Sequence, residues 1–179
     1  VVAGNPNQNQ GKTAYSYIMK AQNEALKEAW NNFKEIHGGL FGSPLKKDFE
    51  KFKKENAFWL DNDSLYEALS LENDNDFWYT WKNESDKNLM NPKSEEEIEF
   101  YKFCQFVLEI QNEETKKFAL SKGIKMIADR QVAFSDRDAW AYQSLFLEGW
   151  YLGCPPDYFS KDGQAWGFPV MDPDKMFNA

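Results

Sequence analysis

The sequence has little of what metal centres, catalytic triads and disulfide frameworks require. His37 is the single histidine, so the chain alone provides neither a histidine-based metal site nor a serine–histidine triad. The two cysteines, Cys104 and Cys154, lack paired spacing, which argues against a disulfide framework and a zinc site. We therefore expect no metal, and the reducing cytoplasm as the default location.

Excess basic charge and long apolar runs are also missing. The chain has 21 Lys and Arg against 29 Asp and Glu, a formal net charge of -8. Phosphate binding needs a basic face, so we expect no nucleic-acid partner. No apolar run approaches the roughly 20 residues of a membrane span, and no basic amphipathic helix is apparent, so we expect no membrane partner.

Aromatic residues are what the sequence has in quantity. They make up 17% of a chain of 179 residues, which is long enough for one domain with a real core. Most of the 15 Phe suit that core. The 7 Trp and 8 Tyr suit it less well, because their N–H and O–H groups favour partly wet sites. Some of these rings are expected to form a binding surface.

The first two thirds of the chain have helical patterning. Residues 1–12 are polar and predict a mobile tail. Residues 13–37 repeat apolar side chains at helical spacing and end at Gly38-Gly39. Ser43-Pro44 then has the form of a helix start, and further helical segments follow up to residue 122. We therefore expect a helical region over 13–122.

Residues 123–129 change the pattern. Gly123 closes the last helix, and IKMIAD follows as a short apolar strand that ends in Asp129. This order predicts an αβ unit. In a β/α barrel an acid in that position faces the active-site rim, whereas elsewhere it caps a turn, and position alone does not separate these alternatives. Residues 136–146 again have a helical pattern.

The segment CPPDYFSKDGQAWGFP, residues 154–169, concentrates proline, glycine and large rings. This composition predicts a long irregular loop rather than a helix or a central strand. Such a loop after a barrel-type strand is a common place for ligand contacts. The alternative is a rigid surface loop whose rings pack inward.

Three ordered stretches resemble one family. PPDYFSKDGQAWGFP (155–169) resembles the PPDYFSxxGQxWGNP segment of the 4-α-glucanotransferases, the amylomaltase family. FKKENAFWLDNDSLYEAL (52–69) is similar to that family's F-x-x-E-N-x-x-W-L-x-D-Y-A-L stretch. GIKMIAD (123–129) with DAWAYQSLF (138–146) resembles its GIxIIGD strand followed by DVWxxPxLF.

The resemblance implies an α/β fold, a fragment of a (β/α)8 TIM barrel with a mainly helical insertion region. It implies retaining transfer of glucan segments between maltooligosaccharides without a cofactor, with a maltooligosaccharide or α-glucan as partner. Tyr158, Phe159 and Trp166 would cover the apolar faces of sugar rings. Asp157 and Gln164 would bind the hydroxyl rim, because a carboxylate accepts hydrogen bonds and an amide both donates and accepts them.

Three departures limit the match. The stretch between Asp129 and Trp140 is two residues shorter than the family pattern, so either Asp136 or Asp138 occupies the family's sugar-binding acid position. Phe168 stands where many members have Asn. The family's nucleophile and acid/base carboxylates lie beyond the PPDYF loop. We therefore expect them outside this chain, and we expect no catalytic residue within it.

A (β/α)8 barrel typically needs about 250 residues, which also favours part of a larger transferase. Residues 13–122 would then be the helical insertion region, and 123–179 one βα unit with its substrate loop. Two alternatives remain: a non-catalytic glucan-binding module from a truncated relative, and a helical interaction protein in which the motif match is incidental.

Overall fold

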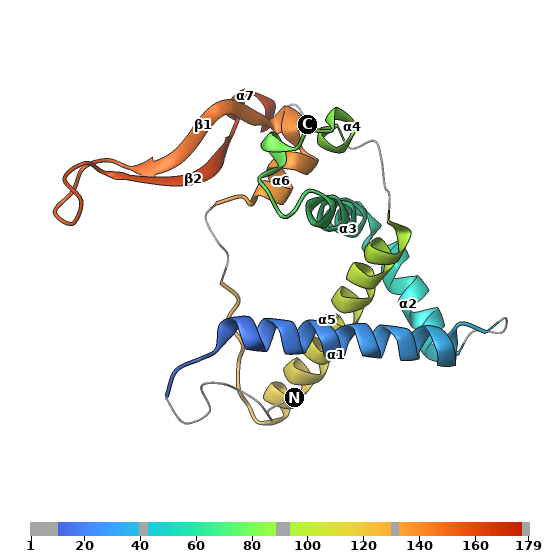
Figure 1. Ribbon diagram of the computed structural model, residues 1–179. Coiled ribbons are helices and arrows are strands. Elements are labelled where there is room, and N and C mark those ends of the chain that lie inside the picture. The colour runs from blue at the N-terminus through green and yellow to red at the C-terminus, as the bar shows by residue number, and fades with distance from the viewer. Residues whose placement is uncertain (1–10, 40–42, 89–93, 130–132, 177–179) are drawn as a thin grey trace.

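The computed structural model describes residues 11–39, 43–88, 94–129 and 133–176. Four longer helices form its main body: α1 (Tyr15–His37), α2 (Pro44–Glu55), α3 (Ala57–Glu72) and α5 (Glu95–Ser121). Short helical elements are η1 (Trp78–Thr80), α4 (Glu84–Lys87), α6 (Asp136–Ala141), η2 (Gln143–Leu145) and α7 (Pro173–Met176). Strands β1 (Phe146–Cys154) and β2 (Gln164–Met171) form an antiparallel hairpin that projects away from the helices (Figure 1).

The helical patterning predicted from the sequence is confirmed. Helix α1 ends at Gly38, whose N–H donates to the carbonyl of Lys34. Ser43 caps α2 by accepting from the N–H of Lys46, and Pro44 occupies the first turn, where its missing N–H costs nothing. Gly123 follows α5 with a φ of 71°, the left-handed conformation that glycine adopts without steric cost.

An aromatic core joins the four longer helices. Phe33 and Phe49 meet edge to face, with ring centroids 5.6 Å apart. Full burial of one such side chain contributes about 1.5–3 kcal/mol, so this cluster stabilises the helical body. Its buried members come from all four helices: Trp30, Phe33, Phe49, Phe52, Leu60, Phe103 and Phe106.

A second buried cluster positions the smaller elements. Leu69, Trp81 and Trp140 pack together, with the ring of Tyr66 against both tryptophans. The indole N–H of Trp140 donates to the carbonyl of Asp86 at 2.9 Å. The cluster therefore fixes α6 and the segment after η1 on the end of α3.

The segment expected to be irregular, residues 154–169, is irregular only in part. Cys154 ends β1, and Gln164 to Pro169 belong to β2, so the loop is confined to residues 155–163. Pro169 stands in the ladder opposite Tyr151. Proline is tolerated there because each strand of a two-stranded sheet has one edge without a ladder partner, where the missing N–H costs no hydrogen bond.

The strand predicted at residues 124–129 is wrong. These residues form neither a helix nor a strand, and Ile127 is 94% exposed. A parallel barrel strand needs neighbouring strands on both sides, and the described residues form only the antiparallel hairpin. The fold of the described part is a set of packed helices with a two-stranded sheet. Residues 1–10 of the predicted tail lie outside the described residues.

Candidate functional site

The loop at the hairpin tip is held by its own hydrogen bonds. Asp157 Oδ1 accepts from the backbone N–H groups of Phe159 and Ser160, at 2.9 and 2.7 Å. The hydroxyl of Ser160 donates to the carbonyl of Gly163 at 2.6 Å. One oxygen of Asp157 is therefore committed to shaping the loop.

The two tip rings face outward. Tyr158 is 94% exposed and Phe159 is 89% exposed, and their rings meet edge to face at 5.4 Å. The alternative in which these rings pack inward is wrong. Large exposed rings on a loop stiffened by Asp157 form a surface that is available for a ligand.

Gln164 and Trp166 form a pair on β2. They stand two residues apart, so they share one face of the strand. The indole N–H of Trp166 donates to Gln164 Oε1 at 3.0 Å. This bond orients the ring, and the amide nitrogen of Gln164 remains as a donor.

A groove runs along the base of the hairpin, between the hairpin and η1. It consists of two adjoining hollows of about 670 and 590 Å3. The first, which we call the Trp166 hollow, lies between Phe77 and the strand residues Trp166 and Phe168. The second, the Trp150 hollow, lies between Trp78 and Trp150. The two hollows share Tyr79, Asp136 and Tyr151.

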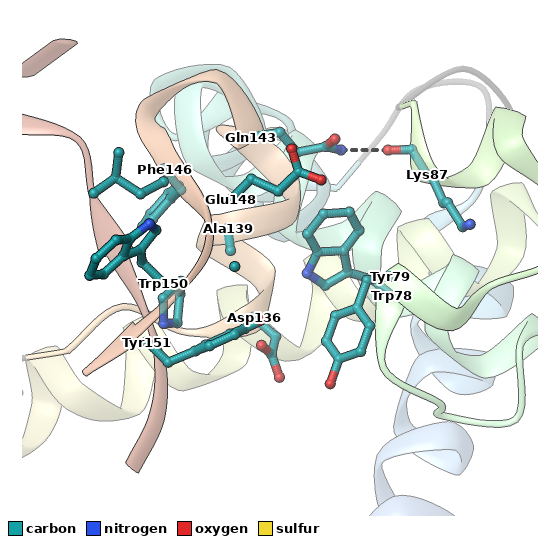
Figure 2. Close-up of a pocket in the computed structure, with 13 residues that line it drawn as sticks. Trp78, Tyr79, Lys87, Asp136, Ala139, Gln143, Phe146, Glu148, Trp150 and Tyr151 are labelled. Atoms are coloured by element: carbon teal, nitrogen blue, oxygen red, sulfur yellow. Dashed lines mark hydrogen bonds between the residues drawn. The ribbon is translucent and has the colours of Figure 1, made fainter. Parts of the chain in front are cut away.

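Aromatic rings form both walls of the Trp150 hollow. Figure 2 shows Trp78 and Tyr79 on one side, Trp150 and Tyr151 on the other, and the carboxylates of Asp136 and Glu148 between them. Such a combination of ring faces and a few hydrogen-bonding groups is typical of small-molecule sites.

Asp136 is the acid of the groove. It lines both hollows, and within the described residues no hydrogen bond engages its carboxylate. Burial raises the pKa of Asp136 above its ordinary value of 3.8. Its place at the start of α6 is fixed by Trp140, which packs in the second buried cluster four residues further along the helix.

Asp138 has a different task. Its Oδ2 accepts from the backbone N–H of Ser135 at 2.9 Å and from the Ser135 hydroxyl at 2.7 Å. Ser135 Oγ in turn accepts from the N–H of Asp138, which completes a capping box at the start of α6. Of the two acids that the sequence left open, the geometry places Asp136 in the groove.

Asp129 lies apart from these residues. It is exposed at the end of the irregular segment 124–129 and lines neither hollow. The structure thus gathers Gln164, Trp166 and Asp136 at or next to the groove. It places Asp157, Tyr158 and Phe159 at the hairpin tip, and Asp138 in a helix cap.

Sequence patterns did not single out the groove residues Trp78, Tyr79, Glu148, Trp150 and Tyr151. The signal was present in the runs FWYTW and GWY, which are dense in the ring types that favour partly wet sites. Only the fold brings these two runs together, because they lie far apart in the sequence.

Within residues 11–39, 43–88, 94–129 and 133–176, no group of three or more His, Cys, Asp and Glu side chains is placed to hold a metal ion. No helix among them has the length and apolar character to cross a membrane.

Comparison with known proteins gives consistent matches. A sequence model of a family described as 4-alpha-glucanotransferase matches residues 3–179. The chain is 31% identical over 177 residues to the 4-alpha-glucanotransferase of Aquifex aeolicus, covering 90% of this chain and 34% of that protein. It is 33% identical over 176 residues to that of Thermus thermophilus, with the same coverage of 90% and 34%.

A solved structure agrees in fold. The amylomaltase from Streptococcus agalactiae, in complex with acarbose, matches with a TM-score of 0.80 and 24% identity, over 93% of this chain and 35% of that chain. The chain thus spans about a third of the length of the relatives it matches. With the family match over residues 3–179, the chain belongs to the 4-alpha-glucanotransferase family.

Proposed function

We propose that this chain is the part of a cytoplasmic 4-alpha-glucanotransferase that holds glucan next to the reaction centre. The whole enzyme would transfer α-1,4-glucan segments between maltooligosaccharides by a retaining mechanism, with the catalytic carboxylates outside this chain. The observation that carries the proposal is the aromatic groove with Asp136 at the hairpin base, in a chain of this family.

The groove suits a sugar chain on chemical grounds. A pyranose ring has apolar C–H faces and a rim of hydroxyl groups. Tyr79, Tyr151 and Trp166 offer ring surface for the faces, and the Asp136 carboxylate accepts hydrogen bonds from hydroxyls. The matched amylomaltase structure contains acarbose, which supports a sugar-like ligand for this family.

The residues predicted from the sequence take separate roles in this proposal. Tyr158 and Phe159 cover sugar faces from the hairpin tip, while Gln164 binds hydroxyls beside Trp166. Asp157 acts through the loop that it shapes. We assign the sugar-binding acid to Asp136, and we give Asp138 the task of holding Asp136 in place through the cap.

The barrel remains part of the proposal. We infer that the rest of the enzyme supplies the strands of a (β/α)8 barrel and covers residues 124–129. Two observations support this: the chain covers about a third of its relatives, and Ile124, Met126 and Ile127 are exposed although they are apolar. The division into residues 13–122 and 123–179 stays a prediction.

The family match over residues 3–179 contradicts the interpretation as a helical interaction protein with an incidental motif. It does not favour a truncated glucan-binding module over part of a transferase, and no feature of the groove requires that alternative.

A kinetic experiment tests the proposal. In the full-length transferase that contains this chain, Trp166→Ala should lower kcat/KM for maltotriose disproportionation about tenfold or more, because ring contact and the orientation of Gln164 are lost together. Tyr158→Ala should act in the same direction. Phe58→Ala, which removes an exposed ring on α3, is the control and should have little effect. Unchanged kinetics in both site variants would refute the proposal.

A further inference from the structure

The Trp150 hollow has features that the family motifs do not account for. Trp78, Glu148 and Trp150 lie outside every stretch that resembles the family. Trp150 is 67% exposed, so its ring is available to a ligand or to another part of the enzyme. The hollow therefore needs a functional explanation of its own.

β1 has an irregular register where it borders the hollow. Neighbouring residues of a regular strand point to opposite faces, yet Trp150 and Tyr151 both line this cavity. The pairing of the two strands shows the irregularity. Phe146 pairs with Met171 and Tyr151 with Pro169, so β1 has four residues between these pairs where β2 has one. Within the extra length, Gly149 has a φ of 74°. Bulges of this kind re-aim side chains, often beside functional sites.

The polar groups of the hollow favour a neutral ligand rich in hydroxyl groups. Within the described residues no hydrogen bond or ion pair engages the carboxylate of Glu148, so it is available to accept, like Asp136. The Gln143 amide nitrogen donates to the carbonyl of Lys87 at 2.5 Å, which fixes the amide and leaves its oxygen as an acceptor (Figure 2). Two carboxylates disfavour an anion, and the only cation of the lining, Lys87, is paired with Glu84 at 3.0 Å.

The hollow is continuous with the Trp166 hollow, because Tyr79, Asp136 and Tyr151 line both. A linear chain bound at Trp166 can therefore extend toward Trp150 without leaving the groove. Short chains would fill the Trp166 hollow alone, and only longer chains would gain contact with Trp78 and Trp150.

We propose that the Trp150 hollow is an additional sugar subsite, and that Trp78 and Trp150 set the preference of the enzyme for longer glucan chains. The proposal rests on the proposed function, since it extends the same groove. Its distinguishing property is dependence on chain length.

A series of maltooligosaccharides tests it in the full-length transferase. The quantity is the ratio of kcat/KM for maltoheptaose to that for maltotriose. Trp150→Ala should lower this ratio about tenfold, and Trp150→Phe, which keeps a ring, should restore most of it. Trp150 is largely exposed, so its loss should leave the melting temperature nearly unchanged. Gly149→Ala, which disfavours the left-handed conformation of the bulge, should lower the ratio in the same way.

The outcomes separate the two proposals. If Trp166→Ala lowers kcat/KM for every chain length but Trp150→Ala leaves the ratio unchanged, the additional subsite is refuted while the proposed function stands. An equal loss for both sugars in Trp150→Ala also refutes it, because a length preference requires unequal losses. If neither Trp166→Ala nor Tyr158→Ala has an effect on any sugar, the proposed function itself fails.

Discussion

Arg137 joins three helices through one side chain. From α6 its guanidinium donates to Asp63 at 3.1 Å and to Glu67 at 3.2 Å, both on α3, and to the hydroxyl of Tyr101 on α5 at 2.7 Å. The planar fork of arginine suits such a set of acceptors, which a lysine cannot match. Since Arg137 directly follows Asp136, it also fixes the start of the helix that lines the groove.

Replacing Arg137 should therefore destabilise the protein strongly. Arg137→Ala leaves two partly buried carboxylates without their shared cation, and we expect a loss of about 2–4 kcal/mol in the free energy of unfolding. Urea denaturation measures it. Lys116→Ala is the matched control, because Lys116 forms an exposed pair with Glu113 and its loss should change stability very little. Equal losses in the two variants would contradict the role of Arg137.

In our proposal, Asp136 makes glucan binding depend on pH. Burial raises its pKa from the ordinary value of 3.8, so the folded state holds the proton more tightly than the unfolded chain. The destabilisation from burying the charged form is thus absent below the ordinary value, grows between that value and the raised pKa, and is complete above the raised pKa. Binding has the opposite dependence, because only the ionised carboxylate accepts from sugar hydroxyls with both oxygens.

We therefore expect the affinity for maltoheptaose to fall as the pH is lowered through the raised pKa of Asp136. Asp136→Asn should bind about tenfold more weakly at neutral pH, with a flatter pH profile, and calorimetric titration measures both quantities. Asp129→Asn serves as the comparison, since Asp129 lines neither hollow and the variant keeps Asp136. A profile in Asp136→Asn that is as steep as in the unchanged protein would assign the titration to another group.

The hairpin depends on one glycine at its tip. Gly163 has a φ of 74°, and an added Cβ would stand 2.5 Å from the carbonyl oxygen of Cys154. Gly167 has nearly the same φ, 73°, but open space around the Cβ position. The pair therefore separates the cost of the left-handed conformation from the cost of a steric clash.

Gly163→Ala should disorder the tip, whereas Gly167→Ala should only strain the strand by about 1 kcal/mol. Tryptic cleavage after Lys161 reports on the tip, and we expect much faster cleavage in Gly163→Ala than in Gly167→Ala. Similar cleavage rates in both variants would show that the close approach to Cys154 does not hold the loop.

At the scale of elements, the sequence predicts the helices far better than the strands. Periodic apolar residues together with Ser43-Pro44 and Gly123 are local signals, and α1, α2 and α5 follow from them. The strand predicted at 124–129 failed because strand formation depends on partners that local pattern does not show. Likewise, the motif led to Trp166, but only tertiary packing brings Trp78 and Trp150 together.

At the scale of the whole molecule, the helical body and the groove depend on different clusters. The aromatic core holds α1, α2, α3 and α5, while Leu69, Trp81 and Trp140 hold the elements that form the groove. Exposed apolar side chains gather in another place, from Phe118 through Ile127. In our account the remainder of the transferase covers that stretch, and the groove stays open to glucan.

Hydrogen exchange in the full-length transferase, with and without maltoheptaose, tests the central claim most directly. The account predicts slower exchange on sugar binding in peptides covering residues 77–81 and 146–168, and no change in residues 15–37 of α1. Unchanged exchange in residues 77–81 and 146–168 at a saturating sugar concentration would contradict the assignment of the groove as the glucan site.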